Sequence, residues 1–426
     1  MTDVLEDLAD ISGNNSAVSR GTVLRRHPYS VGFFVVCIGV FLAVIVGALE
    51  MEILGLDFGV FHAGGTLISS EGYAAAYDTT GFSAFFTEEY FPQWAQTDNV
   101  AHFISTPTFG WFAQPLALFP FGTMLAVWTV FGFIALIPAC RILELPRWAP
   151  LALAISPMMA FNVALGQTGA FVLLLFAAWH VAHRQANVVA AGLLGGLLIL
   201  KPPLALGYGL LWLLQAKRYR LSIAIAAAVG AVLSIPTLAG GISPWQSFLE
   251  AMVQRTEAES AWAQQSGSFS EFVKQLTPGA PTAVTVASWL LGLLAAGVLL
   301  VMAKRRFGND PEVLSAAAAI GTVVASPHLL VYDSLILVIP LAVAHRRGVL
   351  TKDRAGLLAL VIVGSIALGP TLFGVQYSLI GRGLGVEFLA LSAATVLLAC
   401  WLGEDAGSSN PLRDNDDSVP VGSALS

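Results

Sequence analysis

Apolar runs close to the length of a membrane crossing recur along almost the whole chain, beginning with Tyr29 to Leu49. About 20 apolar helical residues cross the hydrocarbon of a bilayer. Only 11% of the 426 residues are charged, against about 25% in a typical soluble domain. Because backbone polar groups inside a membrane must be satisfied within helices, the sequence predicts an all-α polytopic membrane protein.

The expected helices number about twelve, with both chain ends in the cytoplasm. They are expected near residues 29–49, 122–143, 148–165, 169–181, 188–200, a sixth ending at 214, then 221–238, 284–302, 313–325, 329–344, 356–373 and 386–402. This arrangement puts 17 of the 21 Lys and Arg on the cytoplasmic side, as the positive-inside rule requires. The exceptions are Lys201, Arg255, Lys274 and Arg382.

Three regions follow from this topology. Residues 1–24 are expected to form a disordered cytoplasmic N-terminus, 25–402 the transmembrane domain, and 403–426 a disordered cytoplasmic tail. The protein is expected in the cytoplasmic membrane, surrounded by membrane lipids. The net charge of −6 gives no reason to expect a nucleic-acid partner.

Two long external loops are predicted, at about residues 50–119 and 239–282. The first contains eight acidic residues, many aromatic residues and no Lys or Arg. Its apolar piece Phe109 to Phe119 is too short to cross a bilayer and is expected to be an interfacial helix or a re-entrant segment. In the second loop, apolar residues recur at helical spacing from Trp245 to Val253, which predicts an amphipathic helix lying on the membrane.

Asp57 is the first candidate for chemistry. It lies just beyond the first span, in the stretch Leu54 to Ala63, with glycines on both sides and the aromatic Phe58 next to it. A carboxylate at the wet membrane interface suits a general base. The alternative is that Asp57 only caps the start of an interfacial helix.

Further polar candidates lie near the predicted outer ends of spans, where ionisable residues are costly and often functional. They are Asn162, Gln167, Lys201, His328, Asp333 and Arg382. Lys201 precedes two prolines and could bind phosphate, or could extend its side chain to lipid headgroups. Asp333 could orient His328 or a nearby cation. Arg382 could be a plain loop charge, and Asn162 and Gln167 could satisfy backbone groups at a helix break.

No metal-ligand spacing, glycine-rich phosphate loop or nucleophile signature is found in the sequence. No metal-binding residues and no cofactor are therefore expected, while the sequence leaves a requirement for a metal ion open. An enzyme working on the outer face has no ready supply of nucleotide sugars, and a sugar carried on a lipid phosphate would remove that difficulty.

The chain resembles glycosyltransferase family 87, membrane enzymes of the GT-C superfamily. The resemblance extends over roughly residues 25 to 350. It rests on Gly55 to Gly64, Tyr77-Asp78, Gln114 to Pro120 with Trp128, Asn162 to Gln167, Lys201-Pro202, Ser326-Pro327-His328 and Tyr332-Asp333. The sequence differs from the usual family pattern by an insertion of roughly residues 80–105. It also carries Thr106 to Phe109 and Gln114-Pro115 where a Tyr-Pro-Pro-Leu motif is more common.

The resemblance implies a GT-C-like bundle that uses a polyprenyl-phosphate sugar, typically mannose. It implies Asp57 and His328 as catalytic residues. Lys201 and Arg382 are the candidates for the donor phosphate. Substrate contacts are expected from Phe58, His62, Tyr77, Asn162, Gln167, Tyr332 and Asp333.

The sequence thus predicts an inverting hexosyltransferase that passes a sugar to a lipid or glycan acceptor on the outer face of the membrane. Two alternatives from other classes stay open. One is a secondary transporter of a small solute, which would use charged residues and broken helices to bind it. The other is a non-catalytic protein of envelope assembly.

Overall fold

All regular structure among the described residues is helical. The structure is a computed structural model that describes residues 28–93, 100–239, 241–257, 273, 277, 282–326 and 331–348. No strand occurs in these ranges. The predicted fold class is therefore confirmed as helical in the part of the chain that is described, while the expected helices near 356–373 and 386–402 lie outside it.

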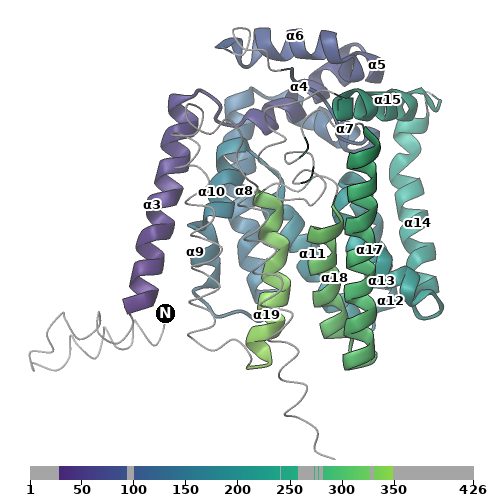
Figure 1. The fold of residues 1–426 in the computed structure, drawn as a ribbon. Helices are drawn as coiled ribbons and strands as arrows, with labels where there is room; N and C mark the ends of the chain where they lie inside the picture. The colour runs from purple at the N-terminus through teal and green to yellow at the C-terminus, as the bar shows by residue number, and fades with distance from the viewer. Residues whose placement is uncertain are drawn as a thin grey trace, which may run out of the picture.

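Three of the described helices are long and apolar enough to cross a membrane. They are α8 (Phe121–Ile142), α14 (Ala216–Leu238) and α17 (Thr282–Phe307), the last from Ala283 onward. With α3 (Pro28–Glu50) they run roughly parallel in the bundle of Figure 1. Their outer faces carry exposed apolar side chains such as Val130, Val232 and Leu294. Such faces suit contact with lipid rather than water.

The third expected span is not one helix. It consists of α9 (Ala149–Ala154) and α10 (Pro157–Leu165), which are separated at Ile155 and Ser156. Pro157 has no N–H to continue the hydrogen-bond ladder of α9. The Ser156 hydroxyl instead accepts a hydrogen bond from the Met159 N–H at 3.3 Å and caps a new helix.

The two prolines after Lys201 end a helix, as predicted. Here α12 (Val188–Gly196) continues into the 3-10 turn η3 (Leu197–Leu200), and η4 (Pro202–Ala205) leads into α13 (Leu206–Leu214). Lys201 lies between the two 3-10 turns with non-helical backbone angles (φ −143°, ψ 69°). The break places its side chain among the bundle helices rather than along a helix face.

Helices from both predicted external loops cover one end of the bundle (Figure 1). This cap layer consists of α4 (Leu56–Ser70), α5 (Tyr73–Tyr77), α6 (Thr79–Glu89), α7 (Pro107–Ala113), η2 (Gln114–Leu118) and α15 (Ser243–Glu257). The two loops share an apolar core, in which the Tyr77 and Phe248 rings lie 6.0 Å apart. The short apolar piece from Phe109 forms α7 and η2 within this layer.

Basic residues gather at the other end of the bundle. The remaining described helices of the bundle are α11 (Gly169–Arg184), α18 (Pro311–Ala325) and α19 (Val338–Arg346), and η6 (Val331–Leu337) precedes α19. Ion pairs at this end join Arg184 to Glu144 and Arg347 to Asp310, each at 2.5 Å. The described parts of the loops predicted to be cytoplasmic therefore lie together, and the described parts of those predicted to be external lie together at the opposite end.

Candidate active site

Asp57 is the second residue of α4 and lies in its first turn. Gly55, in the left-handed region at φ 77°, is the N-cap, so Asp57 does not cap the helix. The Gly55 N–H donates to the Ala164 carbonyl at 2.7 Å and ties the start of α4 to the end of α10. The carboxylate thus lies where the helix dipole favours a negative charge.

Gln167 holds the Asp57 carboxylate. Its amide Nε2 donates to Asp57 Oδ2 at 2.8 Å, and its Oε1 accepts from the Thr168 N–H at 3.2 Å. Its backbone carbonyl accepts from Trp128 Nε1 at 3.1 Å. Both ends of the side-chain amide are therefore bonded, which fixes which end faces Asp57.

The turn that carries Gln167 is tightly packed. It joins α10 to α11 through Gly166, which has φ 69°. A Cβ added at Gly166 would lie 2.5 Å from the Phe58 Cβ. Only glycine fits there without displacing α4. The close approach brings Gln167 within reach of Asp57.

Lys201 lies on the other side of the same turn. Its Nζ donates to Asp333 Oδ1 at 2.5 Å and to Thr168 Oγ1 at 3.3 Å. The ammonium also lies 5.2 Å from the centre of the Tyr332 ring. Tyr332 and Asp333 are both buried on η6.

A connected group of polar side chains results, which we call the site cluster: Asp57, Gln167, Thr168, Lys201 and Asp333. The adjacent residues Gln167 and Thr168 join the carboxylate on one side to the ion pair on the other. A carboxylate can accept a proton, and an ammonium can bind an anion through charge-assisted hydrogen bonds. The site cluster therefore holds a candidate base and a candidate anion-binding cation in one region. His328 and Arg382, the remaining catalytic and phosphate-binding candidates, lie outside the described residues.

Asn162 lies behind the turn. It is buried, and its backbone carbonyl accepts from the Gln167 N–H at 2.8 Å. Its Oδ1 has no partner among the described residues. The structure therefore places Asn162 next to the site cluster as a support of the turn, and its predicted contact with substrate stays a prediction.

Three other predicted substrate contacts are engaged within the cap layer and its junction with α8. The Phe58 ring is fully buried and lies 5.6 Å from the Trp128 ring. His62 bonds to the Tyr90 hydroxyl at 2.7 Å and to the Phe119 carbonyl at 2.9 Å. Tyr77 donates to the Ser105 carbonyl at 2.7 Å, and burial raises its pKa. These side chains stabilise the fold around the site, and their contacts with substrate remain predictions.

Thr168 is the member of the site cluster that sequence reasoning missed. Its hydroxyl contacts the candidate cation, yet a threonine in a short turn carries no chemical signature of its own. Its position next to Gln167, at a helix break near a membrane surface, is the one signal that could have identified it. In the described part of the chain, no group of three or more His, Cys, Asp or Glu side chains is arranged to hold a metal ion.

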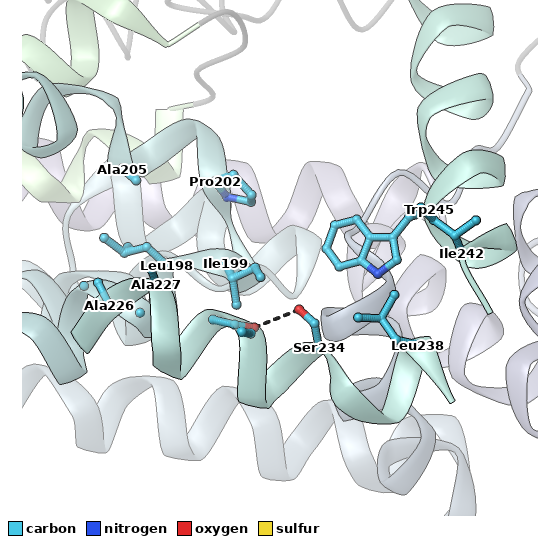
Figure 2. A pocket seen from close by; sticks show the side chains of 14 residues that line it. Leu198, Ile199, Pro202, Ala205, Ala226, Ala227, Ser234, Leu238, Ile242 and Trp245 are labelled. Atoms are coloured by element: carbon cyan, nitrogen blue, oxygen red, sulfur yellow. Dashed lines mark hydrogen bonds between the residues drawn. The ribbon is translucent and has the colours of Figure 1, made fainter. Parts of the chain in front are cut away.

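An apolar groove, whose lining includes Pro202, the residue after Lys201, has a volume of about 680 Å³. It runs between the η3–η4 break and α14 toward Trp245 at the start of α15 (Figure 2). Its lining is Gly195, Gly196, Leu198, Ile199, Pro202, Ala205, Ala226, Ala227, Gly230, Ala231, Ser234, Leu238, Ile242 and Trp245. The Ser234 hydroxyl is turned to its own helix, donating to the Gly230 carbonyl at 2.8 Å. The groove thus offers an apolar surface to a ligand.

Residues 103–331 match the model of a family described as Glycosyltransferase family 87. This range includes Gln167 and Lys201 but begins after Asp57. No curated protein and no solved structure matches the chain.

Proposed function

Since the chain belongs to glycosyltransferase family 87, and is therefore a membrane glycosyltransferase, we propose that it transfers a sugar from a polyprenyl phosphate to a lipid or glycan acceptor. Mannose is the first candidate for the sugar, and the outer face of the cytoplasmic membrane is the proposed side. Family membership argues against the two alternatives, a secondary transporter and a non-catalytic envelope protein.

One observation carries the proposal: the turn at Gln167 and Thr168 contacts both the Asp57 carboxylate and the Lys201 ammonium. Transfer from a lipid phosphate needs a base for the acceptor hydroxyl and a cation for the departing phosphate. The site cluster supplies both kinds of group from segments that are far apart in the chain.

In the proposed reaction, the Asp57 carboxylate accepts the proton of the acceptor hydroxyl. The hydroxyl oxygen forms a bond to the anomeric carbon while the bond from that carbon to the phosphate oxygen breaks. The electron pair of the broken bond leaves with the polyprenyl phosphate, and attack from the opposite side inverts the configuration. General-base assistance of this kind contributes about 10²–10⁴-fold to a rate.

Lys201 is proposed to hold the departing phosphate. An ammonium that donates hydrogen bonds to phosphate oxygens stabilises the charge that grows on them as the bond breaks. In the structure Lys201 is paired with Asp333. The donor phosphate would then share or replace that partner on binding. His328 and Arg382 remain candidates for the same role.

The apolar groove is proposed to hold the polyprenyl chain. Its lining includes Pro202, the residue after Lys201, and several residues of α14. A lipid whose phosphate reached Lys201 could place its isoprenoid units against this apolar lining, where van der Waals packing rather than transfer out of water would hold them.

The direct test is transfer of radiolabelled mannose from polyprenyl-phosphate mannose to a membrane lipid extract by the purified protein. Product is expected with the wild type and should be lost with Asp57→Asn, while Glu71→Gln, at the exposed far end of the same helix, should retain activity. Near-normal transfer by Asp57→Asn would remove the base assignment. Absence of transfer from every polyprenyl-phosphate sugar offered to the wild type would contradict the donor class.

A further inference from the structure

We infer that Gln167 is a positioning residue for Asp57: its amide orients the carboxylate with a neutral hydrogen bond and leaves it able to accept a proton. The inference rests on the proposed function, since it gives Asp57 the part of the base. It assigns Gln167 a defined task instead of a general contact with substrate.

The amide of Gln167 can face Asp57 only one way. Its Oε1 is engaged by the Thr168 N–H, so Nε2 is the end that donates to Asp57 Oδ2. The backbone on either side is also held, since the Gln167 N–H donates to the Asn162 carbonyl and the Gln167 carbonyl accepts from Trp128. Gln167 is 7% exposed. Such a side chain behaves as a fixed donor rather than as a mobile surface group.

A neutral donor suits a base better than a cation does. A nearby positive charge stabilises the ionised carboxylate strongly and lowers its readiness to take a proton, whereas an amide hydrogen bond does so to a smaller degree. The only cation in the site cluster, Lys201, is engaged by a different carboxylate, that of Asp333, at 2.5 Å. Asp57 thus accepts a hydrogen bond from the neutral amide of Gln167, and Asp333 accepts one from the ammonium of Lys201.

Within the part of the chain that the structure describes, few other titratable side chains surround α4. On α4 itself, His62 is bonded to the Tyr90 hydroxyl and the Phe119 carbonyl. The titratable side chains of the described elements packed against α4 are Tyr73 and Tyr77 on α5, Glu88 and Glu89 on α6, and Arg141 at the far end of α8. Gln167 is therefore the described side chain best placed to tune Asp57.

Two variants of Gln167 separate the effect of losing the hydrogen bond to Asp57 from the effect of adding a charge beside it. Gln167→Leu removes the hydrogen bond to the charged form of Asp57, and Gln167→Glu places a second carboxyl group against it. Like-charge carboxyls share one proton and titrate at higher pH. Gln185→Leu, an exposed glutamine just after the other end of α11, is the matched control.

The first measurement does not require turnover. A hydrophobic carbodiimide reacts with protonated carboxyl groups, and mass spectrometry of Asp57 in detergent-solubilised protein gives the pH at which labelling is half-maximal. We expect this midpoint to rise by about one pH unit in Gln167→Leu, the size expected for loss of a hydrogen bond to a charged group. It should rise further in Gln167→Glu and stay unchanged in Gln185→Leu.

The second measurement is the pH profile of sugar transfer. The acidic limb of kcat/KM should move upward with the labelling midpoint, with Gln167→Glu recovering part of its activity at higher pH. A residue that served only to stabilise the fold would lower activity equally at every pH. Identical labelling midpoints in wild type, Gln167→Leu and Gln167→Glu would overturn the inference, even if the wild type is active. Shifted midpoints with no transfer by the wild type would instead leave Gln167 coupled to Asp57 and count against the proposed function.

Discussion

Lys201 Nζ lies 2.5 Å from Asp333 Oδ1, although 132 positions of the chain separate the two residues. The Asp333 side chain is 4% exposed and that of Lys201 is 30% exposed. The pair ties the break between η3 and η4 to η6. The Asp333 carboxylate is less accessible to water than the Lys201 ammonium. Removing the lysine therefore costs a different amount of folding free energy from removing the aspartate.

Lys201→Met should destabilise the protein because it removes the ammonium that pairs with the buried Asp333 carboxylate. We expect a loss of about 2–3 kcal/mol, at the lower end of what breaking a buried pair costs because Lys201 is partly exposed. The double variant Lys201→Met with Asp333→Asn should recover most of that stability without recovering transfer. Thermal unfolding in detergent measures the first effect, and the transfer assay measures the second.

Arg305 is exposed at the end of α17, and Arg305→Gln is the control for the loss of a positive charge away from the site cluster. If the double variant were as unstable as Lys201→Met, the broken Lys201–Asp333 ion pair would not account for the stability that Lys201→Met loses. If the double variant transferred sugar as well as the wild type, Lys201 could not be the phosphate-binding residue.

Asp310, at the end of the bundle opposite the cap layer, should make the stability of the protein depend on pH. Burial works to raise the pKa of Asp310, but the Arg347 guanidinium and the N–H groups of Val313 and Glu312 outweigh it and hold the pKa below its usual value. A lowered pKa in the folded state means that the stabilisation is complete above the ordinary value of 3.8 and is lost as the pH falls through the folded value.

Asp310→Asn keeps an oxygen that can cap α18 but removes the charge. Its melting temperature should lie below that of the wild type at pH 7, and the difference should shrink below about pH 4. Asp310→Ala should lose about 1 kcal/mol more at every pH because the cap is lost as well. A difference between Asp310→Asn and wild type that is the same at pH 7 and pH 3 would contradict this assignment.

The groove predicts a dependence on the length of the donor lipid. Ala227 lines the groove, and its neighbour Ala228 is exposed on α14 and does not line it. Ala227→Trp should therefore raise KM for a long-chain polyprenyl-phosphate sugar by about tenfold, the effect of losing about 1.4 kcal/mol of binding. A donor with only two or three isoprene units should be affected much less.

Ala228→Trp adds the same bulk to the adjacent position of the helix and should leave both KM values near those of the wild type. Equal effects of Ala227→Trp on long-chain and short-chain donors would show that the lipid chain lies elsewhere.

Local features of the sequence predicted α8 almost to the residue. The expected span was Gly122 to Leu143, and the helix is Phe121–Ile142, because apolar length and a flanking arginine mark the ends of a membrane crossing. The same reasoning joined α9 and α10 into one span. A Ser-Pro pair inside an apolar run changes the average hydrophobicity little, although it ends one helix and caps the next.

Individual residues of the site could be selected from the sequence, but their contacts could not. The cost of charged groups near membrane depth marks Lys201 and Asp57 as candidates, and the position of Asp333 predicts that it orients His328 or a cation. Gln167, which donates to Asp57, lies 110 positions away in the turn between α10 and α11. That contact depends on the packing of Gly166 against Phe58, which a single sequence does not report.

The contact between α12 and α14 gives the last prediction, because it needs glycine at two positions one helical turn apart. A Cβ at Gly196 would lie 2.5 Å from the Val229 Cβ and 2.9 Å from the Ala226 carbonyl, and Gly192 is equally close to Ile225. Close approach of two helices through small residues is a common source of stability in membranes.

Gly196→Ala should force the helices apart and destabilise the protein by about 1–3 kcal/mol. Gly297→Ala on α17, where a Cβ meets nothing within 4 Å, should stabilise slightly or have no effect, since alanine is the better helix former. Thermal unfolding of both variants in detergent measures the difference, and equal melting temperatures would mean that α12 and α14 do not pack as closely as the structure has them.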